Sequence, residues 1–162
     1  MEKRKRKNRL EEVIALIATL SKEDKKKILF CIKESKDIIP ISAFNAELSC
    51  LEIVIKYLKE EDKKTSKEIS ALLNRKLSTV YTTYNNSKLK YKKKLDLSDN
   101  SVSIPTYIFQ NRKFSVLESV AAFLKDNESL SLKEISLHLN RNYNTIKTVY
   151  ARYKKKLIEQ IN

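Results

Sequence analysis

One helix face near the C-terminus carries side chains that could contact the edges of DNA bases. Asn144 could pair bidentately with adenine, Lys147 could donate to guanine, and the methyl group of Thr148 could contact thymine. These residues lie at the start of a predicted helix, and the start of the second helix of a helix-turn-helix is the part that reaches base edges. The candidate base contacts on this face are Tyr143, Asn144, Lys147, Thr148 and Ala151.

An equivalent helix 66 residues earlier presents a different set of side chains on the same face. Its candidate base contacts are Leu77, Ser78, Tyr81, Thr82 and Asn85. Only Thr82 and Thr148 agree between the two sets. We therefore expect the two helices to contact unlike half-sites of an asymmetric, bipartite DNA target. The alternative interpretation is drift on a surface without function.

Basic residues around the same helices are candidates for contacts with the phosphate backbone. Such contacts give affinity and salt dependence but little sequence preference. The candidates are Arg75, Lys76, Lys88, Lys90, Arg141, Arg152, Lys154, Lys155 and Lys156, and the lysines at 92–94 extend the set. Some of these lysines are expected to be ordinary solvated helix surface.

The overall charge agrees with a nucleic-acid partner. The chain has 162 residues, with 34 Lys and Arg against 20 Asp and Glu, and a net charge of +14. Hydrophobic residues make up 41% of it, which is enough for cores and unlike a disordered basic tail. No run reaches the roughly 18 apolar residues of a membrane span. We expect a soluble, cytoplasmic, nucleoid-associated protein with no membrane partner.

The composition excludes several kinds of catalytic and metal site. Glycine is absent, whereas a P-loop, a Rossmann fingerprint and an EF-hand loop each need it. Cys31, Cys50 and His138 are the only cysteines and histidine, too few for a structural zinc site with four such ligands. No nucleophile and base stand at a suggestive spacing. We expect a non-enzymatic protein without cofactor, metal or small-molecule substrate.

An internal repeat organises the chain. At a shift of 66 residues, the segment 49–84 falls on 115–150: both copies contain Lys-Glu-Ile-Ser (67–70, 133–136) and Leu-Asn-Arg (73–75, 139–141). Upstream, Ile39-Pro40 matches Ile104-Pro105 at a shift of 65. Downstream, Tyr-Lys-Lys-Lys-Leu recurs at 91–95 and 153–157, a shift of 62. Two related domains are therefore predicted.

Each copy contains the signals of three helices. A Ser or Thr followed three residues later by Glu is a capping box that begins a helix. The boxes are Ser49/Glu52, Thr65/Glu68, Ser115/Glu118 and Ser131/Glu134. The short second helices are predicted to end before Asn74 and Asn140, since asparagine suits a left-handed turn. The longer third helices are predicted over about 77–95 and about 143–157.

A short helix, a tight turn and a longer helix form a helix-turn-helix. We therefore expect an all-α protein, with a basic arm and helical hairpin at 1–38, helix-turn-helix domains at 39–95 and 109–162, and a linker at 96–108. The extended linker could span about 40 Å, against about 34 Å between adjacent major grooves on one DNA face. The N-terminal hairpin could pack on the first repeat or join two chains into a homodimer.

Residues 131–157 resemble the region-four helix-turn-helix of sigma factors and the related response-regulator output domains. In those families a Glu-Ile-Ala helix leads through Leu-Gly-Ile-Ser to a Thr-Val-Lys helix that closes on Lys-Lys-Leu. Here Thr145-Ile146-Lys147 and Lys155-Lys156-Leu157 fall at the same spacing, and residues 65–88 are a looser second match. The resemblance implies binding to double-stranded DNA, a role in transcription regulation, and RNA polymerase as a further partner.

The chain departs from the family pattern at the turn. The family's glycine is Asn140 here, which a left-handed conformation tolerates. Its buried isoleucine is Arg141, whose charged end must extend to solvent or to a phosphate. Its capping serine is Asn142, a good cap, whereas the equivalent residue of the first copy is Lys76, a poor one.

Other functions remain open at this point. A coating or bridging protein of the chromatin type would bind DNA by charge alone and would bind unrelated duplexes equally. A module that binds RNA polymerase would use the same domains for protein contacts. A pair of ordinary three-helix bundles with solvated basic helices is the structural alternative.

Overall fold

The computed structural model describes residues 14–25 and 37–159, which fall into two separate units. In the smaller unit, within Met1–Lys36, residues 14–19 and 22–25 are helical. The Asp24 backbone N–H donates to Ser21 Oγ at 3.1 Å, so Ser21 caps the second of these helices. The basic run at 3–7 and the apolar positions expected at 10, 13, 28, 29 and 32 lie outside the described residues.

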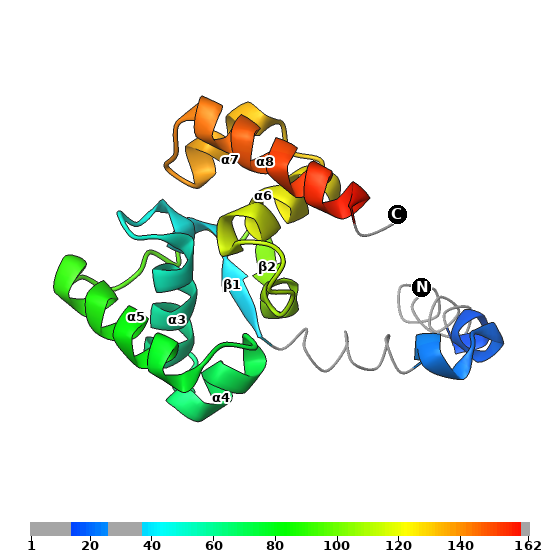
Figure 1. Ribbon diagram of the computed structural model, residues 1–162, viewed down its shortest axis with the longest axis horizontal. Helices are drawn as coiled ribbons and strands as arrows, with labels where there is room; N and C mark the ends of the chain where they lie inside the picture. The colour runs from blue at the N-terminus through cyan, green and yellow to red at the C-terminus, as the bar shows by residue number, and fades with distance from the viewer. Residues whose placement is uncertain (1–13, 26–36, 160–162) are drawn as a thin grey trace, which may run out of the picture. The chain divides into compact units, whose positions relative to one another are not determined.

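The larger unit, Asp37–Asn162, contains both repeats, and each has the same order of elements (Figure 1). The first repeat consists of β1 (Ile38–Pro40), η1 (Ile41–Asn45), α3 (Cys50–Glu60), α4 (Ser66–Leu72) and α5 (Leu77–Lys90). The second consists of β2 (Ser103–Pro105), η2 (Thr106–Phe109), α6 (Val116–Asp126), α7 (Leu132–His138) and α8 (Tyr143–Ile158). No helix within residues 14–25 and 37–159 is long and apolar enough to cross a membrane.

The described residues are mostly helical, but the all-α prediction needs a correction. Strands β1 and β2 pair antiparallel, with Ile39 opposite Ile104. Both isoleucines are completely buried, and β-branched side chains favour extended backbone. Part of the expected linker, residues 96–108, is therefore a strand in the structure. The linker differs from an extended tether because burying Ile104 against Ile39 draws the two repeats together.

One hydrophobic core serves both repeats. It is continuous from the first repeat to the second and includes the paired isoleucines of β1 and β2. Phe44 of η1 and Phe109 of η2, equivalent at a shift of 65, are each 1% exposed within it. A continuous core couples the two repeats, so each one contributes to the stability of the other.

The local signals at the helix starts are confirmed. All four predicted capping boxes form, with the hydroxyl accepting from the backbone N–H of the glutamate and the glutamate carboxylate accepting from the cap. Asn74 and Asn140 have φ angles of 49° and 47°, the left-handed conformation expected of them. These turns fix the angle between α4 and α5, and between α7 and α8.

The third helix of the first repeat ends earlier than predicted. Helix α5 stops at Lys90, and Tyr91 is extended, whereas the prediction ran to Leu95. Leu95 is 6% exposed and belongs to the core. The same pentapeptide, Tyr-Lys-Lys-Lys-Leu, is helical throughout in α8. Packing of Leu95 into the core therefore overrides helix propensity in one copy and not in the other.

Candidate nucleic-acid interface

Each repeat places a short helix and a tight turn before a longer helix with an exposed face. Helices α4 and α7 have seven residues each and pack against α5 and α8, respectively. The turns between them occupy residues 73–76 and 139–142. The turns and the packing of their buried faces hold α5 and α8 in place. The positions of the exposed side chains on the other face of each helix are therefore fixed as well.

The predicted base contacts of α8 are brought together on one exposed face, which we call the α8 base-contact face: Tyr143, Asn144, Lys147, Thr148 and Ala151. The opposite side of the helix carries Ile146, completely buried, and Val149, 7% exposed. The Thr148 hydroxyl donates to the Asn144 carbonyl oxygen at 2.8 Å, so its proton is used within the helix. The hydroxyl of Tyr143, the amide of Asn144 and the ammonium of Lys147 are the polar groups with free donors that this face offers to a ligand.

The α5 base-contact face is built in the same way with one difference. Ser78, Tyr81, Thr82 and Asn85 are exposed, whereas Leu77 is half-buried. Val80, which is completely buried, anchors the other side of the helix. Leu77 is therefore the predicted contact that the structure leaves least accessible to a ligand.

The first turn of α8 is capped by a side chain and the first turn of α5 is not, as their sequences predict. Asn142 Oδ1 accepts from the Asn144 backbone N–H at 2.8 Å and caps α8. At the equivalent position Lys76 makes no side-chain cap to α5. The start of α8 is thus the better capped of the two base-contact faces.

Two of the predicted phosphate contacts form ion pairs with buried glutamates. Lys156 Nζ lies 2.8 Å from Glu118 Oε2, and Lys90 Nζ lies 2.6 Å from Glu52 Oε1. Both glutamates are capping-box residues, 4% and 5% exposed, and each accepts from its serine N–H as well. The lysines are equivalent at a shift of 66, as are the glutamates. In each repeat this ion pair ties the third helix to the start of the first.

Because of this ion pair, Lys156→Met is expected to lower the free energy of unfolding by about 1 kcal/mol. The substitution leaves the Glu118 carboxylate buried without its cation. The neighbouring Lys155 is exposed, so Lys155→Met is the matched control, with an expected change within about 0.5 kcal/mol. Urea denaturation followed by circular dichroism compares the two variants. Equal stability would show that the ion pair contributes nothing.

The ion pairs also predict how stability depends on pH. Burial raises the pKa of Glu52 and of Glu118, but hydrogen bonds from the lysine and the serine outweigh it, and each pKa lies below its ordinary value of 4.5. A lowered folded-state pKa stabilises the protein above the unfolded pKa, and that stability is lost as the pH falls through the folded value. The stability gap between wild type and Glu118→Gln should therefore shrink below pH 4.5. A constant gap in denaturation curves across that range would contradict this assignment.

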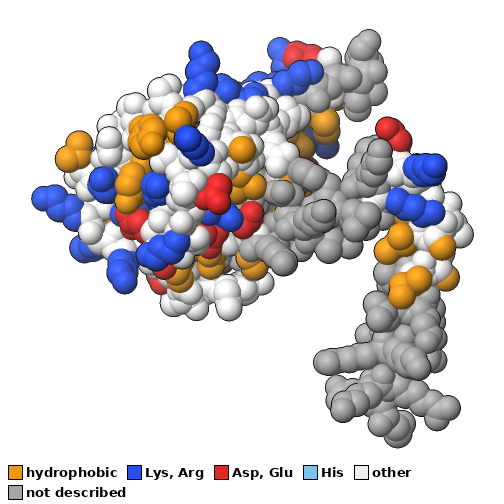
Figure 2. Space-filling model, turned by 90° about the horizontal axis from the view of Figure 1, so that it is seen from below, with side chains coloured by type: hydrophobic (Ala, Val, Ile, Leu, Met, Phe, Trp, Pro, Cys, Tyr) orange, Lys and Arg blue, Asp and Glu red, His pale blue; other side chains and the backbone are white. Residues whose placement is uncertain are grey.

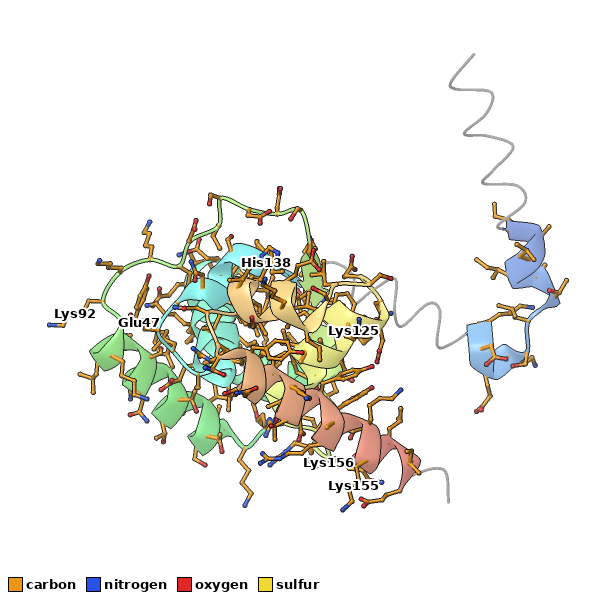
Figure 3. The ribbon with its side chains drawn as sticks, turned by 90° about the horizontal axis from the view of Figure 1, so that it is seen from above. Glu47, Lys92, Lys125, His138, Lys155 and Lys156 are labelled. Atoms are coloured by element: carbon orange, nitrogen blue, oxygen red, sulfur yellow. The ribbon has the colours of Figure 1, made fainter. Side chains whose placement is uncertain are left out.

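Most of the remaining predicted phosphate contacts lie on or next to α5 and α8. Lys76, Lys88, Arg152, Lys154 and Lys155 are exposed, as are the lysines at 92–94. Figure 3 shows Lys92 just beyond α5 and Lys155 near the end of α8, on opposite sides of the view. Figure 2 shows basic side chains spread over the larger unit, with acidic side chains among them. Exposed positive charge thus lies on or next to both third helices.

The two arginines of the turns are half-buried. Arg141 is half-buried, and its guanidinium donates to the carbonyl oxygens of Asn140, at 3.0 Å, and of Leu48 in the other repeat. Arg75 is also half-buried, and its Nε has no hydrogen-bond partner within the described part of the chain. Arg141 therefore links the repeats, a role that its sequence position did not suggest.

A tyrosine on each third helix fixes that helix against the first. The Tyr150 hydroxyl donates to Asp126 Oδ1 at 2.6 Å, and this bond raises the pKa of Tyr150 to about 12. The equivalent Tyr84 hydroxyl lies 3.4 Å from Glu60 Oε1. The Tyr150 contact holds α8 against α6, and the Tyr84 contact holds α5 against α3.

The cysteine and histidine that the structure describes do not form a reactive group. Cys50 is buried, and burial raises the pKa of its thiol to about 11, so it is protonated at neutral pH. His138 is half-buried at the end of α7, and Cys31 lies outside the described residues. Within residues 14–25 and 37–159, no three His, Cys, Asp or Glu side chains gather where a metal ion could bind.

Comparison of the chain with protein-family models, with curated proteins and with solved structures found no match.

Proposed function

We propose that the protein binds double-stranded DNA in a sequence-specific manner and regulates transcription, with α5 and α8 as the recognition helices of two helix-turn-helix units. The observation that carries the proposal is the α8 base-contact face. An exposed asparagine, lysine and threonine stand at the start of a helix whose other side is buried and whose preceding turn is fixed. These are side chains that distinguish base pairs in the major groove.

The charge of the chain supports the same proposal. A net charge of +14 attracts a polyanion, and exposed lysines lie on or next to both α5 and α8. Neutralising several phosphates would make the affinity fall steeply with salt. The resemblance of residues 131–157 to region four of sigma factors favours a role in transcription over another DNA function.

Selection from a random duplex library tests the proposal. The intact protein is incubated with the library at about physiological salt and with excess competitor DNA. We expect enrichment of a motif with two unlike halves, because the α5 and α8 base-contact faces share only Thr82 and Thr148. Strong, salt-sensitive binding without any enrichment would overturn the proposal and favour a protein that coats DNA by charge alone.

A further inference from the structure

The pairing of β1 with β2 relates the two repeats by a local two-fold axis. Ile39 lies opposite Ile104, its own equivalent at a shift of 65. On either side, Ile38 lies opposite Pro105 and Pro40 lies opposite Ser103. Since Ser103 is the equivalent of Ile38 and Pro105 the equivalent of Pro40, each residue faces the equivalent of the other. Such reciprocal contacts define an isologous, two-fold interface.

A second pair of contacts obeys the same symmetry at the turns. Asn74 Nδ2 donates to the carbonyl oxygen of Gln110 at 3.3 Å, and Asn140 Nδ2 donates to that of Asn45 at 3.5 Å. Asn74 and Asn140 are equivalent, and so are Asn45 and Gln110. The turn before each recognition helix is thus bound to the opposite repeat. These hydrogen bonds are long and exposed, but their reciprocity shows that each turn lies against the opposite repeat.

A surface groove lies where the first turns of α3 and α6 meet, and equivalent residues line it from both sides. The pairs are Ser49 with Ser115, Cys50 with Val116, Leu51 with Leu117, and Arg75 with Arg141. The symmetry that the strands and turns define therefore extends to the helices. In Figure 1, α5 lies at the lower left of the larger unit and α8 at its top, and the two helices run in opposite directions; in Figure 3 both lie along the lower edge.

We infer that the DNA target holds its two half-sites in inverted orientation and at one fixed spacing, an inference that rests on the proposed function. A DNA duplex has two-fold axes perpendicular to its own axis, and two-fold related recognition helices match half-sites related by such an axis. A flexible linker would allow direct or inverted half-sites at several spacings. The paired strands and the shared core leave one arrangement.

Comparing the α5 and α8 base-contact faces predicts how similar the two half-sites of the DNA target are. Thr82 and Thr148 occupy equivalent positions, so the base pair that each one contacts is the same in both halves. The other four positions differ: Leu77 and Tyr143, Ser78 and Asn144, Tyr81 and Lys147, and Asn85 and Ala151. The target is therefore an imperfect palindrome rather than a perfect one.

Binding of the full chain to four duplexes tests the orientation. The first carries the two selected half-sites as enriched, and the second carries the same half-sites with one of them reversed. The third keeps the enriched orientation with about 5 additional base pairs between the halves, roughly half a helical turn. The fourth is a scrambled duplex of the same composition. We expect reversal or insertion to weaken binding by at least about tenfold, because one recognition helix then loses its base contacts.

Because the wild-type halves are unlike, their orientation is read from the variant Ser78→Asn/Tyr81→Lys/Asn85→Ala, which gives α5 three side chains of the α8 base-contact face. We expect this variant to select a near-perfect inverted repeat.

The outcomes separate the inference from the function on which it rests. A directly repeated site selected by this triple variant, or equal binding to the first two duplexes when both exceed the scrambled one, would overturn the inverted orientation. Equal binding to the first and third duplexes would overturn the fixed spacing. Equal binding to all four would overturn the proposed function itself.

Discussion

Replacing Ile104 by alanine is expected to lower the free energy of unfolding by about 2–5 kcal/mol and to loosen both repeats together. Ile104 is completely buried opposite Ile39, in the core that the two repeats share. Removing most of its side chain leaves a cavity that the surrounding strands and helices cannot fill. Urea denaturation gives the loss, and hydrogen exchange of the amides in α3 and α6 shows which repeat loosens.

A substitution at an exposed apolar side chain is the matched control. Leu137 on α7 is 70% exposed, so Leu137→Ala is expected to change the free energy of unfolding by no more than about 0.5 kcal/mol. If Ile104→Ala accelerated exchange in α6 but not in α3, the repeats would be independently stable. A shared core would then be excluded, and with it the fixed relation between α5 and α8.

Replacing Lys147 by alanine is expected to relax base preference at one position of the DNA target. Lys147 is exposed on the α8 base-contact face, so the variant should fold as the wild type does. Loss of its donation to a base edge costs about 1–3 kcal/mol, or roughly 5-fold to 150-fold in affinity, for the preferred base pair. Affinity for a duplex already altered at that base pair should change little. Titrations of both duplexes with both proteins measure the difference.

The matched control for Lys147→Ala lies on the same helix and carries the same charge. Lys155 is exposed near the end of α8, beyond the base-contact residues at 143–151. Lys155→Ala is expected to weaken binding to every duplex alike and to lower the salt slope by about one. If both variants gave the same uniform loss, Lys147 would be a phosphate contact and the assignment of the base-contact face would be wrong.

The parts of the fold that depend on local signals could be predicted from the sequence. A capping box needs only a hydroxyl and a carboxylate three residues apart, and all four predicted boxes form. Asn74 and Asn140 adopt the left-handed conformation for which their side chains are suited. The exposure of Asn144 and Lys147 follows from helical periodicity alone.

The parts that depend on distant contacts could not be predicted in the same way. Tyr-Lys-Lys-Lys-Leu is helical at 153–157 and non-helical at 91–95, because only the first copy packs its leucine into the core beyond the end of the helix. The paired strands have three residues each, too short for an alternating pattern to identify them. A sequence repeat shows which residues are equivalent, but it does not show how the two copies are oriented relative to each other. The two-fold pairing of the strands could therefore not be predicted from it.

One missed contact had a signal in the sequence. Glu52 and Lys90 are separated by the same 38 residues as Glu118 and Lys156. The two Tyr-Lys-Lys-Lys-Leu copies align at a shift of 62. At that shift Lys90 is not aligned with Lys156, so the equal separation of the two pairs is not apparent. Continuing the shift of 66 to the end of the third helix makes the two lysines equivalent. An acidic and a basic residue that keep their separation in both copies could then have been recognised as an ion pair.

Sequence-specific recognition is tested most directly by the affinity of the intact protein for the selected duplex, relative to a scrambled duplex of the same length and composition. The measurement is made at about physiological salt, where binding by charge alone is weak. Base recognition by α5 and α8 predicts a ratio of about a thousand or more in favour of the selected duplex. Equal affinities would contradict sequence-specific recognition and reduce the two base-contact faces to ordinary helix surface.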